Sequence, residues 1–94
     1  MSIADVLDQN TRDTLAHCEK LRIEYGLEPV KAFLALAQGE QPTEFLRHRI
    51  VNSGISILLR LDEHGKLCLL PGYLLATKQI TIRDRRCVIR SASP

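Results

Sequence analysis

The sequence is poor in aromatic residues and in long apolar runs. It has no tryptophan, two phenylalanines and two tyrosines among 94 residues, so a core must be built mainly from aliphatic side chains. No stretch approaches the ~18 consecutive apolar residues of a membrane-spanning helix. Residues 1–10 carry Asp5 and Asp8 where a signal peptide needs a basic and then an apolar segment. We therefore expect a cytoplasmic protein with no membrane contact.

Cysteine is scarce and irregularly placed. Cys18, Cys68 and Cys87 are odd in number and far apart, which favours a reducing compartment over a disulfide framework. Each accompanies apolar neighbours at the spacing of a helix or strand, so each is expected in the core. The patterns of common metal, nucleotide and hydrolase sites are missing. The sequence thus predicts no metal, no cofactor and no catalytic residue, and we expect a non-enzymatic protein.

The charges are segregated along the chain. Residues 1–46 hold four basic and eight acidic side chains, whereas residues 47–94 hold nine basic and three acidic ones. The halves therefore carry −4 and +6, which add up to the net charge of +2. Such a distribution indicates an anionic partner for the second half. The alternative is that the two halves neutralise each other within one fold.

The length suits a single domain, residues 1–94, with one core. We expect an α+β fold with two to four helices in residues 1–54. These helices should pack on a small, mostly antiparallel sheet of three to five strands in residues 55–90. Residues 91–94 are expected to form a loose tail.

Helical periodicity dominates the first part of the chain. It predicts a helix near 11–25, either preceded by a short helix near 3–9 or continuous with it. Gly26 should end this helix, and Pro29 should lie in the first turn of the next. A third helix is expected between Thr43 and Asn52. The apolar stripe of the first helix is Leu15, Cys18, Leu21 and Tyr25.

The pattern then changes to that of strands. Residues 55–61 and 66–70 predict a hairpin around a loop in which Gly65 takes a positive φ. Pairing Leu61 with Lys66 leaves apolar groups on both faces, and a sheet with two apolar faces needs cover on both sides. A second copy of the chain is one such cover, so we expect a homodimer. The candidate interface residues are Leu58, Leu67 and Leu69.

A second hairpin is predicted around Asp84-Arg85, after a segment near 73–76 that is ambiguous between strand and helix. Its turn would place Arg83 directly opposite Arg86, and like charges so placed destabilise a sheet. Asp84, the acidic helices or an external anion could each reduce the repulsion between these two arginines. The alternative is that the arginines protect a solvated edge strand from aggregation.

The segment from Val30 to Ile50 reads as helix, turn and helix, and a hairpin follows it. In topology these 40 or so residues resemble a winged helix-turn-helix, which implies binding to nucleic acid through Arg47 and Arg49. Glu40 stands where that motif buries an aliphatic residue. The alternative is an ordinary pair of helices packed on a sheet.

Three functions follow from these observations. The first is a non-enzymatic regulator or adaptor that acts through contact with itself or with an acidic protein surface. The second is a nucleic-acid-binding regulator, and the third is a small enzyme or ligand binder. The candidate anion- or partner-binding residues are Arg47, Arg49, Arg83, Arg85, Arg86 and Arg90.

Overall fold

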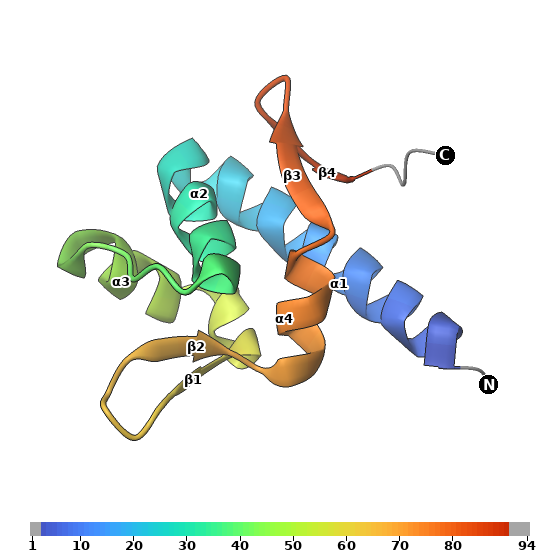
Figure 1. Cartoon of the computed structure of the whole chain (residues 1–94). Helices are drawn as coiled ribbons and strands as arrows, with labels where there is room; N and C mark the ends of the chain where they lie inside the picture. Colours follow the sequence, from blue (N-terminus) through green and yellow to red (C-terminus); the bar gives the residue numbers. More distant parts are fainter. Residues whose placement is uncertain (1–2, 91–94) are drawn as a thin grey trace.

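The computed structural model describes the backbone of residues 3–90 and the side chains of residues 8–90; the predicted tail lies outside this part. The described chain contains four α-helices, two 3₁₀ turns (η) and two antiparallel hairpins, which confirms the α+β class (Figure 1). In chain order the elements are α1 (Ile3–Tyr25), α2 (Leu27–Ala35), η1 (Leu36–Gln38), α3 (Glu44–Val51), η2 (Gly54–Leu58), β1 (Leu59–Leu61), β2 (Leu67–Leu69), α4 (Pro71–Thr77), β3 (Ile80–Arg83) and β4 (Arg86–Ile89).

The first helix is continuous, because no proline or glycine interrupts residues 3–25. It packs against α2, α4 and β4. Its buried stripe differs in part from the predicted one, because Leu15 and Tyr25 are only half-buried. Two threonines occupy the stripe instead, and the Thr14 hydroxyl donates to the carbonyl of Asn10 at 2.7 Å, which makes its burial possible. The fully buried positions of the stripe are Thr11, Thr14, Cys18 and Leu21.

A sharp corner separates α1 from α2. Gly26 has φ 96°, a conformation that favours glycine, and its amide donates to the carbonyl of Arg22 at 2.9 Å. Pro29 lies in the first turn of α2, where its missing N–H removes no helical hydrogen bond. Both predictions for this corner are confirmed.

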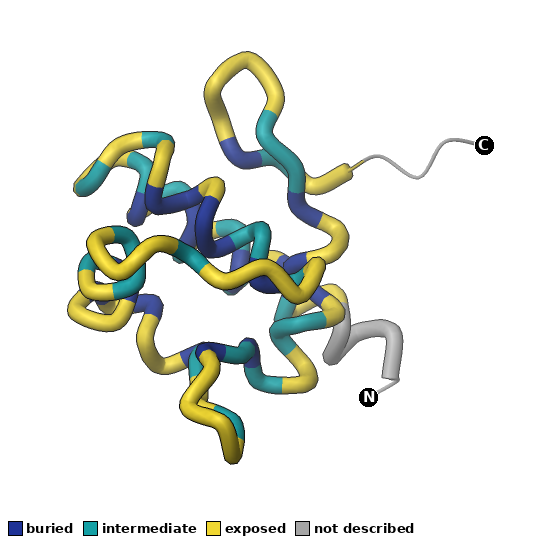
Figure 2. The backbone as a smooth tube through the Cα atoms, turned by 60° about the vertical axis from the view of Figure 1, so that its left-hand side comes forward, coloured by how far each residue is buried: buried dark blue, intermediate teal, exposed yellow. Residues whose placement is uncertain are grey.

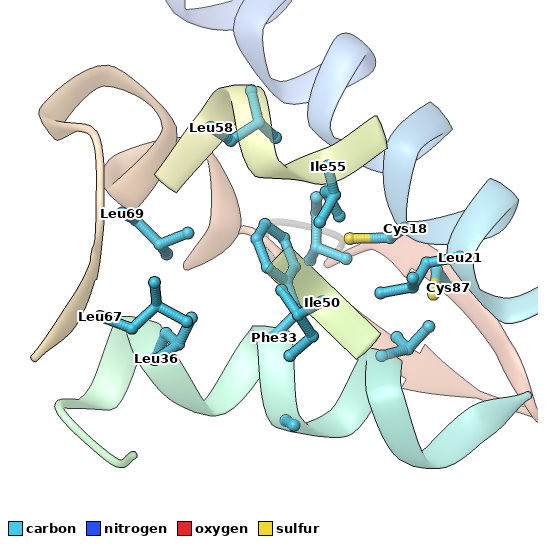
Figure 3. Packing of buried hydrophobic residues seen from close by; sticks show 13 residues of the cluster. Cys18, Leu21, Phe33, Leu36, Ile50, Ile55, Leu58, Leu67, Leu69 and Cys87 are labelled. Carbon is cyan, nitrogen blue, oxygen red and sulfur yellow. The ribbon is translucent and has the colours of Figure 1, made fainter. Parts of the chain in front are cut away.

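The core lies between α1, α2, α3 and η2. Phe33 is fully buried at its centre, with Ile50 and Ile55 beside it and Cys18 and Leu21 contributed by α1 (Figure 3). The buried positions lie on the facing sides of these elements, and the loops of both hairpins are exposed (Figure 2). One aromatic side chain and a set of aliphatic ones therefore form the core, as the composition requires.

The first hairpin has a different register from the predicted one. Leu61 pairs with Leu67 and Leu59 with Leu69, a shift of one residue. The Asp62 carboxylate accepts hydrogen bonds from the amides of His64 and Lys66, both at 2.8 Å, and holds a wider loop than expected. The shift places Leu59 and Leu61 on the same face as Leu69 and Leu67, where the predicted register had them on opposite faces.

The dimer-interface candidates lie inside the chain. Leu58, Leu67 and Leu69 are 1%, 3% and 4% exposed, since they pack against the same core as Phe33. The second apolar layer of the hairpin is therefore covered from within the chain, and these side chains offer no surface to a second copy. Ile57, which belongs to the segment 55–61 predicted as a strand, lies in η2 and is 71% exposed.

The strands form two separate two-stranded sheets where one sheet was expected. The ambiguous segment between them is the helix α4, which begins with Pro71 at its first position and packs on α1. The second hairpin matches its prediction, with Arg83 opposite Arg86 and a turn in which Asp84 and Arg85 have φ 53° and 67°.

Candidate interaction surfaces

The two arginines of the predicted recognition helix make contacts within the chain. Arg47 donates to the carbonyl of Gly65 at 3.2 Å and lies 3.8 Å from the Glu44 carboxylate. Arg49 donates to the carbonyl of Tyr25 at 3.0 Å, and its guanidinium lies 5.3 Å from the centre of the Tyr25 ring. The arginines therefore connect α3 to the first hairpin and to the end of α1.

The connection between α2 and α3 also differs from that of a helix-turn-helix. It runs from Leu36 to Thr43 and includes the 3₁₀ turn η1. A helix-turn-helix uses a turn of about three or four residues. The side chain of Gln41 in this connection pairs with the backbone of Leu67, accepting from its amide at 3.1 Å and donating to its carbonyl at 2.9 Å. The segment thus packs along the first hairpin, which favours the alternative of an ordinary helix pair.

A groove of about 330 Å³ lies between α3 and the first hairpin, and we call it the α3–β1 groove. Two of its apolar side chains are well exposed, Val51 at 43% and Leu61 at 57%. We call Val51 and Leu61 the apolar patch. They are two of the seven large apolar side chains exposed in the described part of the chain, and both line this one groove.

The rim of the α3–β1 groove is mainly basic. Arg47, His48 and Arg60 contribute to it, and Glu44 is its one carboxylate. Arg60 is exposed and has no ion pair within the described residues. The rim can therefore attract carboxylates to an apolar surface. Sequence reasoning missed this site because it assigned η2 to a strand and paired the hairpin one residue out of register.

Arg83, Arg85 and Arg86 lie on an exposed tip of the second hairpin that projects from the body of the molecule, with Arg83 opposite Arg86 (Figure 1). Within the part of the chain that the structure describes, none of them lies in an ion pair. These arginines therefore have no carboxylate within ion-pair distance in the described chain. Arg90 lies at the base of the hairpin, where its amide donates to the Gln79 carbonyl, and it too has no ion pair there.

Glu19 attaches the second hairpin to α1. Its carboxylate accepts from the Cys87 amide at 2.8 Å and forms an ion pair with Arg22 at 2.7 Å. Partial desolvation works to raise the pKa of this carboxyl. The hydrogen bonds from Arg22 and Cys87, with the charges of Arg22 and Arg86, outweigh desolvation and hold the pKa below its usual value. The ionised form is thus the one that stabilises this contact.

Cys18 and Cys87 lie near each other in the core beneath the same contact (Figure 3). The neighbouring Cys87 thiol, together with burial, raises the pKa of Cys18 and keeps its thiol protonated. Both residues are buried and free of disulfide bonds, in keeping with the predicted core role. Among residues 8–90 no three His, Cys, Asp or Glu side chains are grouped so that they could hold a metal ion.

No helix in the described range combines the length and the apolar character needed to cross a membrane. Comparisons with protein-family models, with curated proteins and with solved structures found no match.

Proposed function

We propose that this protein is a small non-enzymatic interaction domain that acts by contact with another protein through its α3–β1 groove. The observation that carries the proposal is the apolar patch. Val51 and Leu61 line a concave surface and are exposed to 43% and 57%. Burying apolar area contributes about 25 cal/mol per Å² to association, but it does not select the partner or its orientation. The charged rim makes that selection.

The rim also defines the partner's chemistry. Arg60 is exposed at the edge of the groove and has no ion pair within the described residues, so a carboxylate next to an apolar side chain complements it. A symmetric dimer through this groove would bring two basic rims together, and like charges across an interface are unfavourable. We therefore propose a different, acidic polypeptide as the partner. The homodimer expected from the sequence stays a prediction, which sedimentation equilibrium tests directly.

Site-directed photocrosslinking tests the proposed surface. A photoreactive benzoylphenylalanine replaces Leu61 in the patch or, as the control, Leu75 on α4, which is similarly exposed at 46%. Illumination in the cells that produce the protein should join position 61, and not position 75, to one defined polypeptide. Mass spectrometry should identify in it a segment that combines acidic and apolar residues. The variant Val51→Glu should suppress the crosslink at position 61 at least tenfold.

The proposal is wrong if positions 61 and 75 crosslink equally, or if Val51→Glu leaves the product at position 61 unchanged. Val51 is on the surface of α3, so this substitution should not unfold the chain, and circular dichroism checks that it does not.

The hairpin arginines favour nucleic acid as a second candidate partner. Arg83, Arg85 and Arg86 are exposed at one tip and unpaired within the described residues. Fluorescence anisotropy with a labelled duplex at low and moderate salt tests it, because binding through phosphates weakens steeply as salt rises. An unchanged anisotropy at low salt would eliminate this candidate. The third alternative, an enzyme or ligand binder, stays a prediction that no feature of the described residues favours.

A further inference from the structure

The outer edge of β3 is a second candidate binding surface. β3 pairs with β4 on one side only, and within residues 3–90 no other strand joins this sheet. An unpaired edge presents N–H and C=O groups that another strand can bind. β3 lies beside α2 in the fold (Figure 1). Residues of α2, η1 and β3 line a groove between them.

The register of the hairpin determines which backbone groups lie on this edge. Arg83 and Arg86 flank a two-residue turn, so they form the closing hydrogen-bonded pair of the ladder. Bonded and non-bonded pairs then alternate along the strands. Thr81 is in a bonded pair and directs its N–H and C=O to β4. Ile80 and Ile82 are in non-bonded pairs and direct theirs away from β4.

Two observed hydrogen bonds agree with this alternation. The Arg90 amide donates to the Gln79 carbonyl at 2.6 Å, which makes this the next bonded pair after Thr81. The Cys87 amide, opposite Ile82, points away from β3 and donates to the Glu19 carboxylate at 2.8 Å. The outer edge of β4 is therefore occupied at Cys87, whereas within the described residues no hydrogen bond outside the ladder engages the backbone of Ile80 or Ile82. Ile82 is half-buried, and Ile80 is 5% exposed and lines the groove beside this edge.

The groove beside β3 has a volume of about 590 Å³, and we call it the β3–α2 groove. Its far wall is built from Leu34, Ala35 and Ala37. Alanine has the smallest apolar side chain, so this wall leaves room for a chain alongside β3. The groove thus combines a strand edge with an opposing apolar wall.

The charge of the groove is positive. Lys31, Lys78 and Arg90 line it, against the single carboxylate of Glu40. Lys31 lies 3.5 Å from an exposed Glu28, whereas Lys78 and Arg90 have no ion pair within the described part of the chain. Lys78 and Arg90 are therefore two cations without an ion pair at the end of the groove where β3 begins.

We propose that the β3–α2 groove binds an extended acidic segment of a partner protein, which adds to β3 as a strand. The strand β3 spans about 13 Å at ~3.3 Å per residue, so about four residues of the segment can pair with it. The open groups of Ile80 and Ile82 supply two donors and two acceptors to its backbone, and Lys78 and Arg90 attract its carboxylates. A second copy of β3 is disfavoured as the occupant, because it would bring further lysine and arginine side chains to the same edge.

Amide chemical shifts of the ¹⁵N-labelled full chain test the proposal. The probe is a capped heptapeptide in which glutamate and valine alternate. On titration the amides of Ile80 and Ile82 should shift downfield as they gain hydrogen bonds, and the Thr81 amide should move much less because β4 already binds it. The same peptide with N-methyl groups on alternate residues lacks the backbone donors and should lose at least tenfold in affinity.

Charge variants provide the matched comparison. The double variant Lys78→Glu with Arg90→Glu should raise the Kd for the peptide at least tenfold. Arg60→Glu introduces the same kind of charge reversal at the α3–β1 groove and should change the Kd less than twofold. All three side chains are exposed, so the fold should survive each change.

The proposal is overturned if the peptide leaves the amides of Ile80 and Ile82 unmoved, or if the N-methylated peptide binds as well as the parent. Equal losses in the double variant and in Arg60→Glu would also refute it. Shifts of the same two amides on raising the protein concentration alone would identify a second copy as the occupant. Shifts caused by an oligothymidylate in place of the peptide would indicate a nucleic acid, and either result refutes an acidic protein segment. Because the α3–β1 groove and the β3–α2 groove have no lining residue in common, crosslinking at position 61 can fail without affecting this outcome.

Discussion

Removing the Glu19 carboxylate should weaken the attachment of the second hairpin to α1. In Glu19→Ala the Cys87 amide loses its acceptor at 2.8 Å and Arg22 loses its partner at 2.7 Å. Hydrogen bonds to charged groups contribute roughly 1.5–3 kcal/mol each, and the groups left behind here are partly hydrated. We expect a loss of about 2 kcal/mol in the free energy of unfolding. That is a substantial share of the ~5–14 kcal/mol expected for a domain of this size.

The lowered pKa of Glu19 gives this prediction a pH dependence. Because the folded pKa lies below the unfolded value of about 4.3, the contribution is present above that value and is lost as the pH falls through the folded pKa. Glu19→Gln keeps an acceptor for the Cys87 amide but has no charge. It should cost about 1 kcal/mol at pH 7, and its difference from the wild type should vanish in acid, where the wild-type carboxyl is neutral as well.

Urea unfolding followed by far-ultraviolet circular dichroism measures both effects, since the chain has no tryptophan for fluorescence. Glu24→Ala is the control, because Glu24 lies on the same helix, is exposed and forms no ion pair within the described residues. It should change stability by less than about 0.5 kcal/mol. Hydrogen exchange of the Cys87 amide should be faster in Glu19→Ala than in the wild type, and unchanged in Glu24→Ala. A stability loss equal to that of Glu24→Ala, or one that persists unchanged in acid, would refute the reasoning.

Three further predictions concern stability. Phe33→Ala should lower the free energy of unfolding in urea by roughly 3–5 kcal/mol, because Phe33 is fully buried. Ile57→Ala should lower it by less than about 0.5 kcal/mol, because that side chain is exposed. Similar losses in the two variants would place Ile57 in the core. Arg85→Gly should raise the urea midpoint and stabilise by up to about 1 kcal/mol, because φ is 67° at this position, and a lowered midpoint would argue against that turn. Gln41→Ala should cost about 1 kcal/mol and speed hydrogen exchange of the Leu67 amide, and unchanged exchange there would show that the paired amide is not formed in solution.

The sequence was most informative where a local rule determines the backbone. Gly26 and Pro29 predicted the corner between the first two helices, and Thr43 predicted the start of the third, where its hydroxyl accepts from the Leu46 amide. The turn at Asp84-Arg85 followed from the strand patterns on either side. These features depend on residues close together in the chain, so the sequence contains the information needed to predict them.

The first hairpin shows where that information ended. Residues 55–58 are apolar enough for a strand, yet they form η2, in which Ser53 caps the turn by accepting from the Ile55 amide. The register then depended on the Asp62 carboxylate, whose hydrogen bonds widen the loop. The predicted dimer surface lies in the core because tertiary packing covers Leu58, Leu67 and Leu69, while Leu61, directly opposite Leu67, stays 57% exposed.

By itself, then, the sequence determined the α+β class, the main helix boundaries, the second hairpin and the separation of acidic from basic residues. Tertiary structure alone decided which apolar side chains remain at the surface, which arginines are engaged within the chain, and which strand edge is left open. The physical reason is range. Helix caps and tight turns are set by neighbours a few residues apart, whereas burial, ion pairing and edge exposure depend on groups such as Glu19 and Cys87, which meet only when the whole chain has folded.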